Sequence, residues 1–464
     1  MSTISNKENL SKKEYSTWTH FSFNLSMVML PATYGFFSTH FFYFYEKVVL
    51  LPVLLVGLAN VIFVIWDSIN DPLIGFLSDR PTRFTKKYGR RFPFIMIFGI
   101  PTVASLVLLF IPLSNAGQSM PWLIFIWMLI WLLLHEFGYT AVSLARALFP
   151  EKFRSDKERR KNAGIGIVTY NIGLFLGLII PFVFVWKSDA MSYFIAVLIL
   201  TIPCLICFFL GIPGIREEPE MIERSFRAET EPFLTTVKKA LKKRNFVVFT
   251  FVNISIQLFA ALMLASINYW VESVLLLPEG SQADVILMIL WFLAGLASVI
   301  LWIKFAAKFG HKKTQLIGLI ATIIVVIPII FVRSLLGAFI IFTILGVAVG
   351  SNTFVKYPVF GDIIDEITLE EKKRQEGMYQ GVLVFFDRIG ILLQPIIFTV
   401  VHILTSYDPT TTVQSPLAQQ GILAAMTWIP AIFLLIAALL FWKFYDLTPE
   451  KSEELKGKLE ELKL

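Results

Sequence analysis

The chain has 464 residues, of which 56% are hydrophobic and 16% are charged. Soluble globular proteins carry about 25% charged residues, so this composition excludes an ordinary water-soluble fold and indicates a polytopic membrane protein. The net charge of +7 does not point to nucleic acid as a partner, because the basic residues gather in alternate loops between apolar segments.

Twelve apolar segments reach the length of about 20 residues that a helix needs to cross a bilayer. Six precede and six follow a polar stretch, near residues 18–45, 49–78, 92–113, 121–149, 162–186, 190–212, 246–275, 283–306, 314–332, 335–360, 378–404 and 419–445. The sequence therefore predicts an all-α membrane protein of twelve transmembrane helices in two pseudo-symmetric six-helix bundles. The predicted divisions are a tail at 1–17, bundles at 18–212 and 246–445, a linker at 213–245 and a second tail at 446–464.

Clusters of lysine and arginine predict the orientation of the chain. They occupy the loops after the second, fourth, sixth, eighth and tenth segments, within residues 80–91, 152–161, 216–244, 308–313 and 372–374. The opposite loops carry little beyond Lys47, Lys187 and Arg333. Because cytoplasmic loops are enriched in basic residues, both termini are expected to be cytoplasmic, in a multi-pass protein of the cell membrane.

Two polar segments show a helical apolar stripe. In the linker, Phe233, Val237 and Leu241 recur every four residues against a lysine-rich face, which is typical of a helix lying on a membrane surface. The C-terminal tail has a shorter stripe at Leu455, Leu459 and Leu462, which we expect to dock on the cytoplasmic face.

Small residues and cysteines inside the apolar segments are interpreted as packing groups. GxxxG spacings predict sites of close helix contact, at Gly173…Gly177, Gly346…Gly350 and Gly377…Gly381. The two cysteines lie within one apolar helix without a second ligand pair, so they indicate neither zinc nor redox chemistry.

The second apolar segment contains acidic residues at membrane depth. Asp67, Asn70 and Asp71 are three and four residues apart, so they share one face of a helix. Two carboxylates this close in low dielectric require that one is protonated or that a cation lies between them. The remaining alternative is that an acid pairs with a base on another helix. Sodium and a proton both stay possible, and for sodium the metal ligands would be Asp67 and Asp71.

An internal repeat provides a control for the acidic residues. Residues 149–164 resemble 360–377, and the turn at Gly89 recurs at Gly310, an offset of 221. Adding 221 to the acidic positions gives Met288, Trp291 and Phe292. The repeat is therefore built without these acids in its second copy, which favours a function for them over a structural role.

A cluster of charged residues follows at the cytoplasmic end of the same segment. Asp79, Arg80, Arg90 and Arg91 are predicted to form a cytoplasmic gate, in which Asp79 pairs with nearby arginines until the protein changes conformation. The alternative is a solvated cluster that serves only to set the topology.

The stretch WDSINDPLIGFLSDR, followed by GRRFPF, resembles the helix-two signature of the glycoside–pentoside–hexuronide:cation symporters. This is the melibiose-carrier-like branch of the major facilitator superfamily, which also contains animal sodium-coupled lysolipid carriers. FPE…ERRKNAG and GDIID…RQEGMYQG fit the same family. The resemblance implies alternating access and cation-driven solute uptake, with Asp67, Asn70 and Asp71 as cation ligands. It also implies a base in helix eleven near the cation site, for which Arg388 is the candidate, with Asp387 as a further acid or a neutralising neighbour.

The solute site departs from the sugar-transporting members of that family. Val142 stands where they have an acid in helix four, and GIGIVTYNIG in helix five is uncharged. In helix one the polar candidates are His20, Asn24 and Tyr34. The candidate solute cavity comprises polar residues inside the predicted helices, which are Tyr34, Glu136, Tyr139, Arg146, Asn268, Glu272, Asn352, Lys356 and Gln380. The amides among them have helix–helix hydrogen bonding as the alternative role.

These observations predict a secondary active transporter that couples a cation, Na⁺ or H⁺, to symport of a small organic solute. Family resemblance suggests a sugar or glycoside. The alternatives are a carrier of an amphipathic or lipid-like solute and a membrane receptor or structural protein without transport. No nucleophile–base pair or metal-ligand cluster indicates an enzyme. The expected partners are the lipid bilayer and the solute, with no nucleic acid, no cofactor beyond the coupling ion, and a monomeric state.

Overall fold

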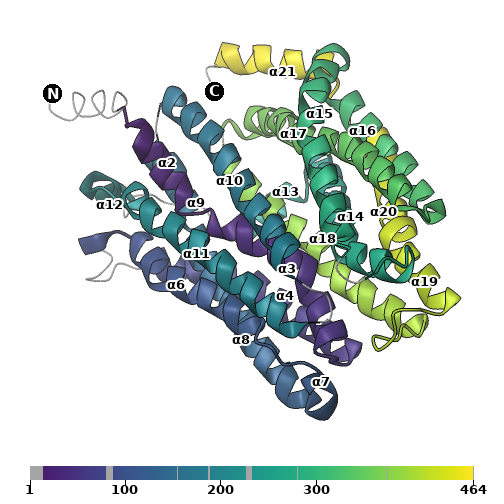
Figure 1. The fold of residues 1–464 in the computed structure, drawn as a ribbon. Coiled ribbons are helices and arrows are strands. Elements are labelled where there is room, and N and C mark those ends of the chain that lie inside the picture. Colours follow the sequence, from purple (N-terminus) through teal and green to yellow (C-terminus); the bar gives the residue numbers. More distant parts are fainter. Residues whose placement is uncertain are drawn as a thin grey trace. The chain divides into compact units, whose positions relative to one another are not determined.

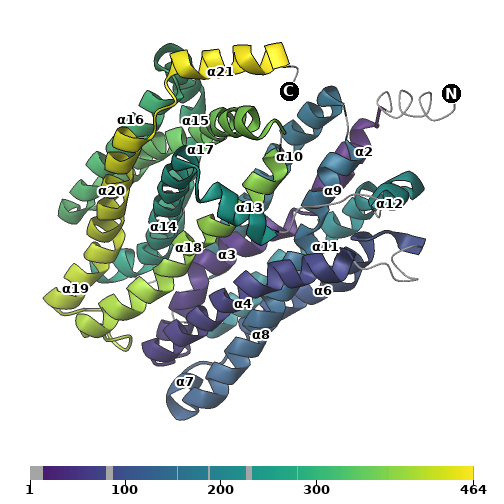
Figure 2. The same ribbon diagram turned by 180° about the vertical axis from the view of Figure 1, so that it is seen from behind.

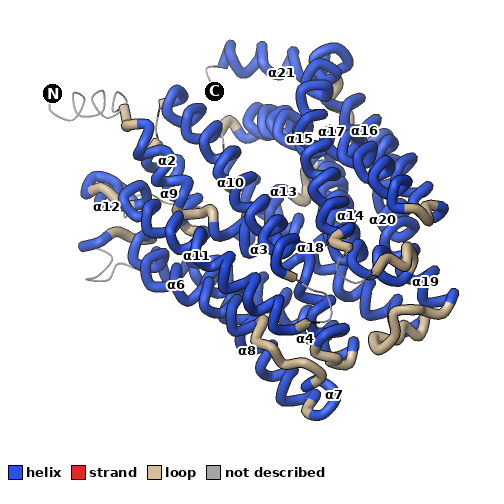
Figure 3. Tube along the Cα trace, viewed as in Figure 1, coloured by secondary structure: helices blue, strands red, loops and turns tan. Residues whose placement is uncertain are grey.

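A computed structural model of the chain describes residues 14–79, 87–153, 155–185, 189–225, 233–278, 281–373 and 375–462. Across these ranges the chain forms helices joined by short loops and has no strand, as Figure 3 shows. The all-α prediction is therefore confirmed. The chain divides into two compact units, Met1–Glu229 and Thr230–Leu464, which are called unit 1 and unit 2 below.

Unit 1 is built from helices that pack pairwise (Figure 1). They are α2 (Thr17–Leu25), α3 (Met29–Tyr43), the π-helix η1 (Phe44–Val48), α4 (Val53–Asp79), α6 (Phe92–Leu109), α7 (Ala116–Ser119), α8 (Pro121–Ser143), α9 (Ala145–Lys152), α10 (Asp156–Phe184), α11 (Ala190–Ile215) and α12 (Pro219–Ser225). Helix α8 packs against α4 and α6, which lie beside it in Figure 2. Helix α10 packs against α3, and α11 packs against α2.

Unit 2 has the same kind of architecture (Figure 1). Its elements are α13 (Phe233–Ala240), α14 (Arg244–Ser273), α15 (Ala283–Phe309), α16 (His311–Val326), the 3₁₀ turn η2 (Ile327–Phe331), α17 (Leu335–Glu371), α18 (Glu376–Leu404), α19 (Pro416–Leu423), the π-helix η3 (Ala424–Trp428), α20 (Ile429–Phe444) and α21 (Pro449–Leu462). Helix α17 packs mainly against α15 and α16, whereas α18 packs mainly against α14.

Eleven helices in the described ranges are long and apolar enough to cross a membrane. The first predicted segment, 18–45, is not among them because it is split into α2, α3 and η1. Pro31 explains the break, since it has no N–H to donate to the carbonyl of Met27, and Leu30 N–H bonds there instead at 3.0 Å. The Ser26 hydroxyl also donates a hydrogen bond to the backbone carbonyl oxygen of Phe23 in α2.

Two of the three GxxxG spacings lie at close helix contacts. A Cβ on Gly173 would stand 2.5 Å from the carbonyl oxygen of Val28, and one on Gly346 would stand 2.3 Å from that of Trp291. For Gly377 and Gly381, no neighbouring helix in the described part of unit 2 comes within 4 Å of a Cβ, so this spacing marks no close contact inside that unit. Sequence spacing identifies which glycines share a helix face but not whether a neighbouring helix covers that face.

These contacts allow a matched test of packing. A Cβ on Gly350 would stand 2.0 Å from Ser298 Oγ and 2.6 Å from the Gly295 carbonyl oxygen. We expect Gly350→Ala to destabilise unit 2 by about 1–3 kcal/mol through overpacking. Gly381→Ala, at an open helical position, should be neutral or slightly stabilising. The measurement is the thermal unfolding midpoint of each variant in detergent, and equal midpoints would contradict the close contact.

In the linker helix, the residues that pack within unit 2 are not those of the predicted apolar stripe. In α13 the buried residues are Thr236 and Ala240, whereas Leu241 beyond its end is half exposed. Helix α13 packs against α18. The side chain of Phe233 lies outside the described residues. Burial of a threonine and an alanine reflects a contact with a neighbouring helix, which hydrophobic periodicity does not reveal.

Helix α21 docks on the end of α17, with Leu455 and Leu459 buried. Polar contacts anchor the segment before it, where Asp446 accepts hydrogen bonds from Asn245 Nδ2 at 2.8 Å and from Lys451 Nζ at 3.1 Å. Burial raises the pKa of the Asp446 carboxyl, but these two partners outweigh burial and hold that pKa below its ordinary value. Docking of the tail should therefore weaken as the pH falls and Asp446 becomes protonated.

Candidate cation site

The three polar residues singled out in the second apolar segment lie on the side of α4 that packs against α8. Asn70 is completely buried and Asp67 is 9% exposed. Asp71, one residue on, is partly buried. The helical spacing thus places two carboxyl groups and an amide at one helix–helix interface within unit 1.

Direct hydrogen bonds connect these residues to α8. Asn70 Nδ2 donates to the carbonyl oxygen of Glu136 at 3.2 Å. Thr140 Oγ1 donates to Asp71 Oδ1 at 2.9 Å and lies 3.4 Å from Glu136 Oε1. A hydroxyl has a single hydrogen, so Thr140 serves one of the two carboxylates at a time. The interface therefore gathers oxygen atoms from α4 and α8.

The amide oxygen of Asn70 is the most informative atom of this interface. It is buried, and no donor in the described parts of the chain reaches it, although the amide nitrogen of the same group is bonded. Buried acceptors are almost always satisfied in folded proteins, so each exception calls for a specific explanation. A bound cation would explain the Asn70 oxygen, because a cation is attracted to an acceptor oxygen and needs no donor hydrogen.

The donor set suits a hard monovalent cation. Carboxylate, amide and hydroxyl oxygens are the ligands that hard cations prefer. In the described ranges no group of three or more histidine, cysteine, aspartate or glutamate side chains is arranged to hold a metal ion. Here the amide of Asn70 and the hydroxyl of Thr140 would complete a set begun by Asp67 and Asp71. Thr140 was not among the predicted ligands, because its role depends on the packing of α8 against α4.

Several residues predicted to line a solute cavity lie near this interface in unit 1. Tyr139 interacts with both Arg146 and Glu136. Tyr34 of α3 interacts with Tyr139 and with Tyr170 of α10, a residue that the sequence analysis did not single out. Electrostatic interactions thus link Tyr34, Tyr139 and Arg146 within unit 1, and Tyr139 also forms a hydrogen bond with Arg146. The neighbouring His135 of α8 packs between helices, since its Nδ1 lies 2.9 Å from the carbonyl oxygen of Thr102.

The other predicted cavity residues and the predicted charge partners Asp387 and Arg388 belong to unit 2. Lys356 Nζ of α17 donates to Asp387 Oδ2 of α18 at 2.6 Å, so these two candidates form an ion pair. Asn352 accepts a hydrogen bond from Gln315 Nε2 at 2.8 Å, which is a helix–helix contact. The remaining candidates are two buried residues, Asn268 and Glu272 of α14, and two half-buried ones, Gln380 and Arg388 of α18.

The predicted gate residues that the structure describes are held within unit 1. Arg91 Nη1 donates to Glu151 Oε1 at 2.7 Å and to the Ala147 carbonyl oxygen at 2.7 Å, and Arg90 Nη2 donates to Glu151 Oε1 at 3.2 Å. The side chain of Asp79 and all of Arg80 lie outside the described residues. Glu151, the acid that serves both arginines, was not predicted, although it follows Pro150 in the next basic loop.

A second acid, Glu217, organises the turn that precedes α6. Its carboxylate accepts the backbone N–H groups of Arg90, Arg91 and Phe92 at 2.7–3.0 Å. Gly89 makes this approach possible, since its φ is +102° and a Cβ would stand 2.6 Å from the Glu217 carboxyl. Glu217 thus satisfies three donors at the start of a helix, where an anion is favoured by the helix dipole.

The Glu217 contact predicts a specific loss of stability. We expect Glu217→Ala to lower the free energy of unfolding by about 2 kcal/mol, because three partly buried N–H groups lose their acceptor. Glu220→Ala, an exposed acid three residues along, serves as the control and should stay within about 0.5 kcal/mol of the native protein. Chemical or thermal unfolding in detergent measures both. A Glu217→Ala variant as stable as the control would show that the cap is dispensable.

Comparison with known proteins identifies relatives over nearly the whole chain. A family model described as MFS/sugar transport protein matches residues 22–449. The sodium-dependent lysophosphatidylcholine symporter 1 of Mus musculus is 23% identical, over 92% of this chain and 85% of that protein. The uncharacterized symporter YnaJ of Bacillus subtilis (strain 168) is 24% identical, over 92% of this chain and 91% of that protein.

Solved structures share the fold. The nucleoside transporter NupG has a TM-score of 0.63 at 12% identity, with 93% of this chain and 100% of that chain covered. A bacterial homolog of the human lysosomal transporter Spinster, in an inward-facing and occupied conformation, has a TM-score of 0.63 at 14% identity, with 93% and 97% covered.

These matches and the membrane-spanning helices agree on the class of protein. The relatives are transporters, and the chain is a multi-pass membrane protein that acts in a lipid bilayer on a small-molecule solute. The family model is one of transport proteins, and several relatives carry names of cation-coupled symporters. The chain belongs to the family of MFS/sugar transport proteins.

Proposed function

We propose that the chain is a sodium-coupled symporter whose ion is held at the α4–α8 interface by Asp67, Asn70, Asp71 and Thr140. The observation that carries this proposal is the buried Asn70 oxygen that no described donor satisfies. A proton site needs only a titrating carboxylate, whereas an amide oxygen and a hydroxyl beside two carboxylates suit a metal cation better. Several relatives are named as sodium-dependent symporters, which supports the same ion.

Within its family the chain is proposed to belong to the glycoside–pentoside–hexuronide:cation symporters, on the strength of the helix-two signature. It works by alternating access, without enzymatic activity and without a cofactor other than the ion. The proposed orientation has both termini in the cytoplasm, with the gate of Arg90 and Arg91 on that side. The role of Arg388 as a charge partner of the ion rests on the resemblance alone, and the monomeric state is likewise part of the proposal.

The proposed solute is sugar- or glycoside-like, recognised in part by the hydroxyl and guanidinium groups of Tyr34, Tyr139 and Arg146. A polyol offers hydroxyls that charged and phenolic partners bind well. The second candidate is a lysolipid. It is supported by the relatives named lysophosphatidylcholine symporters and by apolar Val142, which stands where the resembling sugar carriers have an acid.

Uptake in proteoliposomes tests the ion and the solute together. Purified protein is reconstituted with an inward sodium gradient, an inward proton gradient or no gradient, and offered labelled monosaccharides, disaccharides and lysophosphatidylcholine. Sodium-coupled symport predicts accumulation above equilibrium with the sodium gradient only. Thr140→Val should raise the sodium concentration for half-maximal uptake about tenfold, whereas Thr140→Ser, which keeps the hydroxyl, should not. Accumulation driven by the proton gradient alone would overturn the choice of ion.

A further inference from the structure

A cavity of about 740 Å³ lies within unit 2, where α13, α14, the end of α17 and the segment before α18 meet. Most of its basic residues come from the end of α13 and the start of α14, and one comes from the segment after α17. They are Lys239, Lys242, Lys243, Arg244 and Lys373. Three glutamates near the end of α17 also line it, so five bases and three acids give the lining a formal charge of +2. We call it the basic cavity.

Two of the three acids are held by neutral donors of unit 2. Asn245 Nδ2 lies 2.8 and 3.0 Å from the two carboxylate oxygens of Glu366. The Tyr379 hydroxyl donates to Glu371 Oε1 at 2.8 Å. These contacts occupy the acids without using any of the five bases that line the cavity.

Two of the bases are engaged in ion pairs. Lys243 Nζ pairs with Glu370, the third acid of the lining. Arg244 Nη2 pairs with Asp446, which follows α20. Each of these positive charges has its counter-charge in the protein, so neither is the first choice for holding a ligand.

Lys242 and Lys373 differ from these two bases. Among the residues that the structure describes, neither lysine has an acid within ion-pair distance. Both side chains are exposed to solvent and line the basic cavity. Two ammonium groups without counter-charges, beside a cavity whose lining is positive, attract an anion.

The side chain of Gln375 gives a further observation at the same cavity. Its Oε1 atom is buried, and no donor in the described ranges reaches it. The oxygen and nitrogen of an amide are distinguished only by their hydrogen bonds. Rotating this amide by 180° places its NH₂ group at the buried position, where the group requires an acceptor. An anion in the cavity would supply that acceptor, and buried polar atoms are almost always satisfied.

Two membrane-spanning helices also begin at the basic cavity. Helices α14 and α18 follow Lys243 and Gln375, and both of these residues line the cavity. Neither residue makes a side-chain capping hydrogen bond. The first N–H groups of a helix have no partner within the helix and carry partial positive charge. Both helix ends therefore add to the attraction that the lysines exert on an anion.

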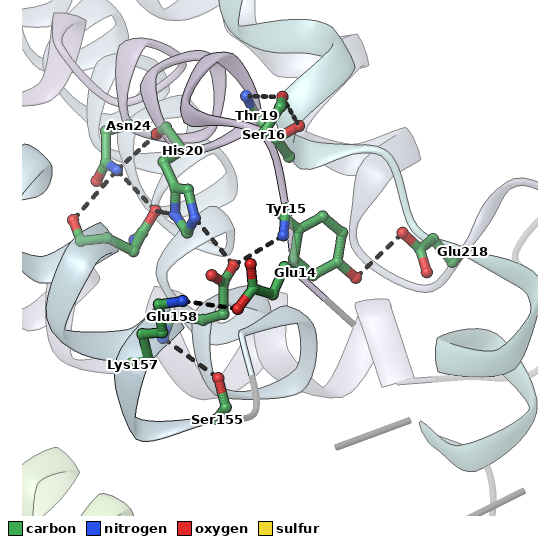
Figure 4. A network of polar contacts seen from close by, with 11 residues as sticks. Glu14, Tyr15, Ser16, Thr19, His20, Asn24, Ser155, Lys157, Glu158 and Glu218 are labelled. Carbon is green, nitrogen blue, oxygen red and sulfur yellow. Dashed lines mark hydrogen bonds and ion pairs between the residues drawn. The ribbon is translucent and has the colours of Figure 1, made fainter. Parts of the chain in front are cut away.

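A charged cluster of unit 1, shown in Figure 4, differs from the basic cavity. There Lys157 pairs with Glu14 at 2.7 Å. Glu158 Oε2 accepts the backbone N–H of Tyr15 at 3.1 Å and lies 3.0 Å from His20 Nε2. The groups of that cluster satisfy one another, so no ligand is needed to complete it.

We propose that the basic cavity binds the phosphate group of an anionic ligand through Lys242, Lys373 and the Gln375 amide. A phosphate monoester carries about two negative charges near neutral pH and has several acceptor oxygens, which match two ammonium groups and an NH₂ group. Basic pockets at the ends of membrane helices hold the headgroups of anionic phospholipids, and a soluble phosphate compound offers the same group. Leu241, half exposed next to Lys242, adds apolar surface that suits a lipid.

A bound phosphate joins the linker helix to the end of α17. Lys242 follows α13, whereas Lys373 and Gln375 follow α17. A ligand that binds only when these segments lie together stabilises the docking of α13. Amide hydrogen exchange of residues 233–245 should therefore slow at least about fivefold at saturating ligand, where occupancy reaches tens of times the dissociation constant.

Binding is measured on the purified full-length protein at constant sodium concentration, with two probes. Inorganic phosphate is titrated onto the protein in an uncharged detergent, and phosphatidic acid is titrated in mixed micelles with the same detergent. The readouts are the exchange of residues 233–245 and the thermal unfolding midpoint. Saturable binding of phosphate supports the site and identifies a soluble ligand, and binding of phosphatidic acid alone supports it and identifies a lipid. Failure of both probes to bind saturably would overturn the proposal.

Two variants test the lysines, with a third as the matched control. Lys242→Gln and Lys373→Gln should each weaken binding about fivefold, since each removes one charge from the ligand's surroundings. Lys238→Gln removes an exposed lysine of α13 that does not line the cavity, so binding should remain native. Equal losses in all three variants would show attraction by overall charge and would contradict a defined site.

Glu370→Gln tests the site in the opposite direction. The substitution removes an acid from the lining and releases Lys243 from its ion pair. Phosphate binding should tighten by about threefold to fivefold. Damage to the fold does not produce tighter binding, so a gain separates the site from a structural effect. An affinity that is unchanged or lower in Glu370→Gln would refute the assignment.

Discussion

Asp71→Asn is expected to abolish accumulation of solute against its gradient. The variant keeps the size of the side chain and can still accept the hydrogen bond from Thr140 Oγ1, but it removes a full negative charge from the oxygen cluster. In a buried site a charge–ion contact is worth several times a neutral one. Sodium affinity should fall at least about 100-fold, which corresponds to about 2.7 kcal/mol. The measurement is sodium-driven uptake in proteoliposomes.

The control for this variant lies on the same helix. Ser68→Ala removes a hydroxyl that donates to the Val64 carbonyl oxygen of its own helix at 2.9 Å, so uptake should remain close to native. Solute exchange at equal concentrations should survive better in Asp71→Asn than net accumulation does, if the loss concerns the ion rather than the fold. Undiminished sodium-driven accumulation in Asp71→Asn would remove this carboxylate from the ion site.

Lys356→Met is expected to be the most damaging single substitution in unit 2. Asp387 is only 6% exposed, and the ammonium of Lys356 is bonded to its Oδ2, while no donor in the described residues reaches its Oδ1. Removing the lysine leaves a buried carboxylate without its ion-pair partner, which costs about 3–5 kcal/mol. The thermal unfolding midpoint in detergent should drop accordingly.

The double variant Lys356→Met, Asp387→Leu separates stability from function. Replacing both charges with apolar groups removes the desolvation cost together with the attraction, so most of the lost stability should return. If the double variant folds but no longer transports, the ion pair serves the transport cycle. If the single variant Lys356→Met is as stable as the native protein, the pair contributes no net stability.

Much of the fold could be predicted because membrane helices are specified locally. Length, apolar composition and basic loops identify the spanning segments without knowledge of their neighbours. The exception is the first segment, where Ser26 follows the end of α2 and Pro31 lies in the first turn of α3. Hydrophobicity averaged over a window does not register a broken hydrogen-bond ladder.

The candidate site could be predicted only in part. Acidic residues within an apolar segment stand out in a sequence, because placing a carboxylate inside the membrane costs free energy. Asp67 and Asp71 are therefore found from their spacing and from this energetic argument alone. Thr140 and Glu217 are ordinary residues whose roles arise from contacts about 70 and 127 positions away in the chain. Such contacts depend on which helices pack together and on their rotation, neither of which a single sequence contains.

The α4–α8 interface limits how the ion preference of the protein can change. Trp66 Nε1 donates to the Leu133 carbonyl oxygen at 3.1 Å, and Asn70 Nδ2 donates to that of Glu136 one turn along. Because both donors lie on one face of α4, these two hydrogen bonds fix the rotation of α4 about its own axis relative to α8. Variants selected for lithium or proton use should therefore change the ligating side chains in place, while the helix itself keeps its angular setting.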